Sequence, residues 1–83
     1  MPVVNPAPKY PEIARKAGIT GTVVVQVLVN KEGKVEAVEI LQGNEVFHEA
    51  AMKVAWKWTF TPAIQNDKPV KVWVALPFRF QLN

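Results

Sequence analysis

The chain has 83 residues, of which 49% are apolar, and it carries a net charge of +3 and no cysteine. This length allows one small domain and is too short for two, and the lack of cysteine excludes disulfides, thiolate zinc sites and cysteine nucleophiles. The lysines are scattered, so we expect no nucleic-acid interface, and no apolar run reaches the roughly 18 residues that a membrane-spanning helix needs.

The N-terminal segment is rich in proline. Residues 2–11 hold four of the seven prolines, which favours an extended lead-in and prevents a helix before Pro11. The following segment, EIARKAG, predicts a short helix that stops at Gly18 and must dock on the rest of the domain to be stable. We therefore expect a lead-in over residues 1–9 and a domain over residues 10–83.

Two strands joined by a short loop come next. Residues 21–30 alternate, with one valine-lined face (Val23, Val25, Val27 and Val29) and one more polar face. The segment NKEGK supplies Gly33 for a hairpin loop, and residues 35–43 return with Val38 and Ile40 on the apolar side. This pattern predicts an antiparallel hairpin with one buried face.

A second helix is predicted from Glu45 to about Lys57. Its apolar stripe has the spacing of one helical face and comprises Phe47, Ala50, Ala51, Val54 and Trp58, with Asn44 as the N-cap. Trp56 points away from that stripe. We expect the proline-rich lead-in to cover Trp56, with a partner protein as the alternative.

The last strand follows a turn at residues 65–69. Residues 70–82 alternate strictly between apolar and polar positions. The predicted order is therefore α-β-β-α-β, an α+β fold in which a three-stranded antiparallel sheet carries both helices on one face. A right-handed crossover puts the third strand beside the first, which gives the strand order 2-1-3 and leaves the second and third strands at the edges.

The third strand is a long apolar edge, which natural proteins usually protect. Pro77 supports the edge position, since proline within a sheet is confined to edges, strand starts and bulges. Pro77, Lys71 and Arg79 are interpreted either as protection against aggregation or as part of an edge that receives an incoming strand. Trp73, on the polar face, reflects either strand propensity or a partner contact, and the sequence leaves both pairs of alternatives open.

The sequence offers few groups for catalysis. It has one histidine, His48, and no glycine-rich phosphate loop, and Glu45 and Glu49 are interpreted as surface acids one helical turn apart. Metal binding by His48 and Glu45 would lack at least one ligand. We predict that the chain is not an enzyme and that it has no cofactor or metal.

Several segments resemble the TonB C-terminal domain family. The opening pattern of this family is matched by Tyr10, Pro11, Ala14, Gly18, Ile19 and Gly21. The segments EGKV (32–35), WTFTPA (58–63) and VALPFRFQL (74–82) are similar to its hairpin loop, its Trp-x-Phe-x-Pro-Ala segment and its closing strand. Two positions depart from the pattern: Glu32 replaces a frequent Asp, and Ala7 stands where some members have Gln, in a region tied to receptor contact.

The resemblance implies the periplasmic end of an energy transducer. It would be anchored in the bacterial inner membrane by an N-terminal segment absent from this chain, with residues 1–9 as the end of the linker. A proton-channel motor complex would drive it, and it would grip the TonB box of outer-membrane transporters in active uptake such as siderophore–iron uptake. Together with the edge strand, the resemblance implies a partner-binding site whose residues are Lys9, Tyr10, Pro11, Lys71, Val72, Trp73, Val74, Ala75 and Leu76. The alternatives are a TonB-like interaction module of a sensor or cell-envelope scaffold protein, and a chain that, if not monomeric, dimerises by edge pairing or strand swapping.

Overall fold

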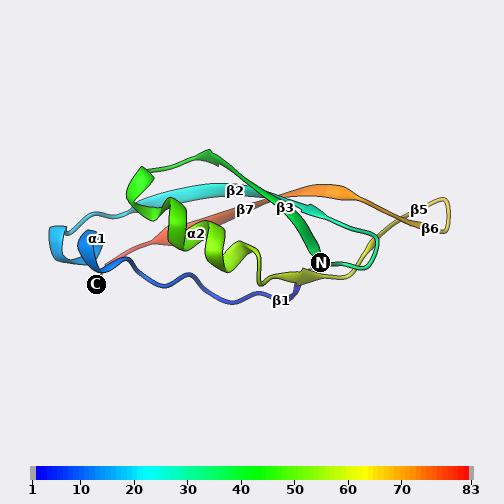
Figure 1. The fold of residues 1–83 in the computed structure, drawn as a ribbon, viewed down its shortest axis with the longest axis horizontal. Coiled ribbons are helices and arrows are strands. Elements are labelled where there is room, and N and C mark those ends of the chain that lie inside the picture. Colours follow the sequence, from blue (N-terminus) through cyan, green and yellow to red (C-terminus); the bar gives the residue numbers. More distant parts are fainter. Residues whose placement is uncertain (1, 83) are drawn as a thin grey trace.

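The structure is a computed structural model and describes residues 2–82. Its main sheet holds three antiparallel strands in the spatial order β3-β2-β7 (Figure 1), namely β2 (Gly21–Val29), β3 (Val35–Gln42) and β7 (Val72–Phe80). The helices are α1 (Glu12–Ala17) and α2 (His48–Ala55), which continues a 3₁₀ turn, η1 (Glu45–Phe47). These main elements follow the predicted α-β-β-α-β order, and the sheet has the expected 2-1-3 arrangement.

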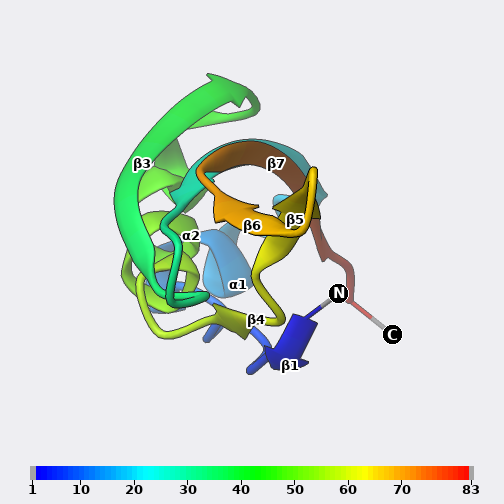
Figure 2. The ribbon, with the colours of Figure 1, turned by 90° about the vertical axis from the view of Figure 1, so that its right-hand side faces the viewer.

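The sheet curves around the helices. Figure 2 shows α1 and α2 inside the curve, so one face of the sheet is covered and the other faces outward. The covered face carries the four valines of β2, each at most 1% exposed, as the sequence predicts. Leu76, Phe78 and Phe80 of β7 are buried on the same side. Burial of this continuous apolar face is the main source of stability.

An aromatic cluster fixes the end of the molecule near α1. Phe47 is fully buried and stacks on Phe80, with ring centroids 4.2 Å apart. The Tyr10 ring meets both of these rings edge-on, at 5.8 and 5.7 Å, and its hydroxyl donates to the Ile19 carbonyl. Edge-on and offset aromatic pairs add stabilisation beyond the area they bury. The cluster therefore ties the lead-in, η1 and β7 together.

The second helix is shorter than the sequence predicts. Asn44 is the N-cap as expected, and its side chain accepts from the Val46 amide at 3.0 Å. The first turn is 3₁₀, and α2 ends at Ala55, before Trp58. Trp58 still packs on the core, with its ring 5.6 Å from that of Phe78. The helix stops early because Thr59 and Phe60 are extended and pair with another strand.

That partner strand comes from the proline-rich segment. β1 (Pro2–Val4) pairs with β4 (Thr59–Phe60), and the Pro6 carbonyl accepts from Trp58 Nε1 at 3.0 Å. The expected cover of Trp56 is therefore wrong: the lead-in contacts Trp58, and Trp56 is 49% exposed. The division of the chain at residue 10 stays a prediction.

A further hairpin extends beyond the main sheet. β5 (Ala63–Gln65) pairs with β6 (Lys68–Val70), and the pair forms the projecting end opposite α1 in Figure 1. Asn66 and Asp67 form its two-residue turn with φ of 52° and 64°, the backbone that a tight hairpin requires. The turn lies within the predicted residues 65–69, but the flanking strands were not expected, and the last strand starts at Val72 instead of Val70.

Candidate functional site

The outer edge of β7 is open. Among residues 2–82, the only strand paired with β7 is β2, through an unbroken register from Gly21–Phe80 to Val29–Val72. The other edge strand, β3, has two irregularities in its register with β2. Irregularities of this kind disfavour further pairing, whereas a long regular edge is a template for another strand. Of the two edges, β7 is the better one for a guest strand.

The direction in which each main-chain group of β7 points follows from the hydrogen bonding of β2 and from the register between the two strands. The Asn30 amide donates to the Lys34 carbonyl at 2.8 Å, so even-numbered positions of β2 direct their main-chain groups toward β3. Val24 belongs to this set and lies opposite Pro77. The main-chain groups of Pro77 therefore face away from β2, where its missing N–H breaks no bond of the sheet.

The same alternation identifies the donors that are open to a guest. Trp73, Ala75 and Arg79 share the parity of Pro77, so their amides and carbonyls also face outward. Val72, Val74 and Leu76 direct theirs toward β2. A guest strand would thus meet donors at Trp73 and Ala75 and only a carbonyl at Pro77.

Side chains along this part of β7 have different surroundings. Trp73 is 50% exposed on the outer face of the sheet, opposite Leu28 of β2. The Lys71 ammonium lies 2.7 Å from a carboxylate oxygen of Glu36. This exposed pair adds little stability, and it places a charged bridge beside the beginning of β7.

The two halves of the predicted site lie apart. Tyr10 contacts Phe80, at the far end of β7, so it is separated from Leu76 by four residues, or roughly 13 Å of strand. Tyr10 is partly buried and holds the lead-in and α1 in place. Lys9, Tyr10 and Pro11 instead line a different feature, a groove between the lead-in and α2.

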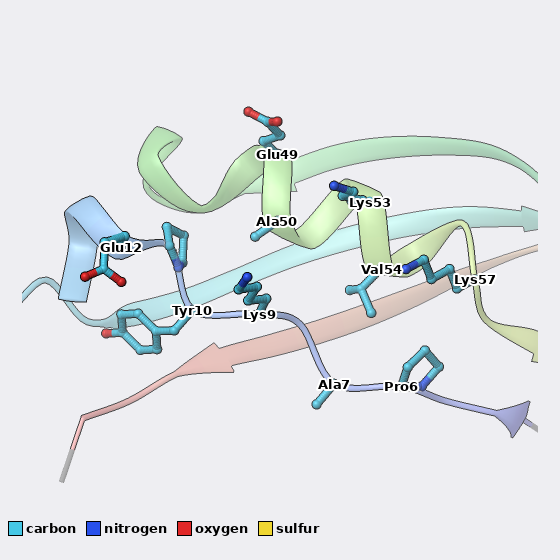
Figure 3. A pocket seen from close by; sticks show the side chains of 11 residues that line it. Pro6, Ala7, Lys9, Tyr10, Glu12, Glu49, Ala50, Lys53, Val54 and Lys57 are labelled. Atoms are coloured by element: carbon cyan, nitrogen blue, oxygen red, sulfur yellow. The ribbon is translucent and has the colours of Figure 1, made fainter.

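We call this feature the lysine groove. Its floor is formed by Ala50 and Val54 of α2, and Lys9 points from the lead-in toward that helix (Figure 3). Lys53 and Lys57 also line it, and its volume is about 490 Å³. Neither lysine is predicted from the sequence as a site residue, although a helix that continued to Lys57 would place both on one face.

The residues considered for catalysis stay separate. His48 Nε2 lies 2.8 Å from the Gly43 carbonyl oxygen, at the exposed start of α2. Within residues 2–82 there is no group of three or more His, Asp or Glu side chains that could hold a metal ion. Nor does any helix in this part of the chain have the length and apolar character needed to cross a membrane.

Comparison with known proteins gives a consistent picture. The family model described as Gram-negative bacterial TonB protein C-terminal matches residues 6–82. The tonB2 protein of Pseudomonas aeruginosa is 38% identical over 81 residues, which are 95% of this chain and 30% of that protein. TonB of Vibrio cholerae is 35% identical over 78 residues, which are 92% of this chain and 32% of that protein. The chain thus spans about a third of the length of these relatives.

A solved structure shares the fold. The solution NMR structure of the Pseudomonas aeruginosa TonB C-terminal domain matches with a TM-score of 0.79 and 25% identity, covering 99% of this chain and 85% of that chain. Fold and edge thus define a small α+β domain with one long, regular, open strand. The chain belongs to the TonB C-terminal domain family.

Proposed function

We propose that this chain is the receptor-binding domain of a TonB-type energy transducer, and that it captures the TonB box of outer-membrane transporters by strand addition along β7. The observation that supports this most is the open outer edge of β7, with the outward donors of Trp73 and Ala75. Strand addition uses main-chain hydrogen bonds for affinity and neighbouring side chains for specificity. The proposed role of the domain is to bind a partner and transmit force rather than to catalyse a reaction.

The expected affinity is modest. A guest along Lys71 to Leu76 gains main-chain hydrogen bonds that are each worth roughly 0.5–1.5 kcal/mol. Ordering the peptide costs about 1–2 kcal/mol per residue before contacts offset it. Reversible capture results, which suits a coupler that must release its partner. Trp73 adds an aromatic surface beside the guest.

The direction of force fits the same geometry. A pull along the strand axis loads the hydrogen bonds of the guest together, in shear, instead of breaking them one at a time. In the proposed arrangement the domain lies in the periplasm, and an N-terminal anchor in the inner membrane links it to a proton-channel motor complex. The proton-motive force would then be passed through β7 to the transporter.

Amide shift mapping tests this proposal. Titration of the labelled monomer with a TonB-box peptide is expected to move the amide signals of residues 71–76, and a peptide of scrambled sequence is expected to leave them in place. Proline introduced along the TonB-box peptide should weaken binding at alternate positions, because only every second amide faces β7. Shifts confined to α1, or no shifts at all, would contradict strand addition. Sedimentation at several protein concentrations serves as the control that the titrated species is a monomer.

A further inference from the structure

We propose that the lysine groove binds an extended acidic peptide segment of a second protein, at a site separate from the β7 edge. The proposal does not rest on the function proposed above, because the groove is built from the lead-in and α2 and contains none of residues 71–76. Its volume of about 490 Å³ lies within the range of ligand-binding sites.

The lysines of the groove have no partner charge. Among residues 2–82, no carboxylate lies within 4.0 Å of the ammonium groups of Lys9, Lys53 or Lys57. Glu12, at the α1 end, is already paired with Arg15 at 2.8 Å. Lys53, in the last turn of α2, and Lys57, in the turn just after the helix, both line the groove, so a bound anion would offset two like charges. The charge pattern therefore favours an acidic occupant.

Lys9 is the most informative of the three. Lys53 lies in the last turn of α2 and Lys57 just beyond the end of that helix, where positive charge also stabilises the helix dipole. Lys9 is on the lead-in and has no such role, yet its side chain points toward α2 across the groove (Figure 3). The groove therefore receives positive charge from both sides: from Lys9 on the lead-in, and from Lys53 and Lys57 on the side of α2.

The groove also suits the shape of an extended chain. Ala50 and the buried side of Val54 form an apolar floor that can receive one small or branched apolar side chain. Apart from the Pro6 carbonyl, no main-chain group of residues 6–10 has a hydrogen-bond partner among residues 2–82. An extended peptide beside the lead-in can use these free groups.

The charges at the two ends distinguish a peptide from a membrane surface. Glu12 and Glu49 lie at the α1 end of the groove, and Lys57 lies toward its other end (Figure 3). A uniformly anionic surface would meet these two carboxylates unfavourably. A peptide can place its acidic residues near the lysines and a neutral or basic residue near Glu12 and Glu49, so we commit to a peptide.

The probe is an acetylated and amidated hexapeptide, EPLEVE, compared with its uncharged analogue QPLQVQ. At low ionic strength, EPLEVE is expected to shift the amide signals of Lys9, Ala50, Lys53 and Val54, and QPLQVQ is expected to bind at least several-fold more weakly. The variant Lys9→Gln/Lys53→Gln/Lys57→Gln should bind EPLEVE about tenfold more weakly, since three exposed ion pairs are lost. A matched control, Lys31→Gln/Lys34→Gln/Lys68→Gln, removes the same charge elsewhere and should bind as the unchanged protein does.

Three outcomes would overturn the proposal. Equal weakening in both triple variants would mean that only net charge attracts the peptide. Shifts confined to β7 would show that the peptide binds at the edge strand and not in the groove. The third outcome is that EPLEVE causes no shift, whereas phosphatidylglycerol vesicles bind in a way that depends on the groove lysines. This would show that the groove binds an anionic membrane surface and not a peptide.

Discussion

Gly33→Ala is expected to lower the free energy of unfolding by about 3–4 kcal/mol, a large part of the roughly 4–12 kcal/mol expected for a domain of this size. Gly33 has φ of 85°, and a Cβ built there would lie 1.9 Å from the Phe60 carbonyl oxygen. That oxygen belongs to the main chain and cannot rotate away. The loop would have to move, and the hydrogen bond from the Phe60 amide to the Gly33 carbonyl, 2.8 Å long, would be lost.

Gly18→Ala is the matched control for this prediction. Gly18 also has positive φ, 70°, but a Cβ there would meet nothing within 4 Å. Its substitution should cost only the backbone strain of about 1–2 kcal/mol. Urea unfolding of both variants measures the difference. Equal losses would show that the contact between the hairpin loop and Phe60 does not contribute.

Ala75→Pro is expected to weaken TonB-box peptide binding about three- to tenfold while the domain stays folded. The substitution removes one outward donor, and one hydrogen bond is worth about 0.5–1.5 kcal/mol. The bonds between β7 and β2 are kept, because the Ala75 amide faces away from β2, as does the ring nitrogen of Pro77. Titration calorimetry with the peptide, and a thermal unfolding curve to verify the fold, check the prediction.

Arg79→Pro serves as the control for position. Arg79 also faces outward, but it lies beyond Pro77 and outside the proposed contact at residues 71–76. Its substitution should leave peptide affinity nearly unchanged. Equal weakening by both prolines would mean that the guest extends past Pro77 or that β7 is generally disturbed.

Regular periodicity explains why the main sheet could be predicted. The valines of β2 and the apolar residues of β7 alternate without interruption, and all of those on the inner face are buried or partly buried. The crossover through α2 then determines which strands are edges. Pro77 added an independent indication of the β7 edge, and the structure shows how its missing donor is accommodated.

Short elements that depend on distant partners could not be predicted. β1 and β4 have three and two residues, too few to show a period, and they form because Pro2–Val4 meets Thr59–Phe60 in space. The same long-range pairing ended α2 early and brought the lead-in to Trp58 instead of Trp56. The lysine groove arises from this placement of the lead-in, so no local pattern indicated it.

Hydrogen exchange at the outward amides of β7 tests strand addition most directly. In the free protein, the amides of Trp73 and Ala75 should exchange quickly, whereas those of Val74 and Leu76, which face β2, should be protected. Saturating TonB-box peptide should slow exchange at Trp73 and Ala75 and leave Val74 and Leu76 unchanged. If Trp73 and Ala75 are already protected without peptide, or stay unprotected with it, the edge of β7 is not where the guest strand binds.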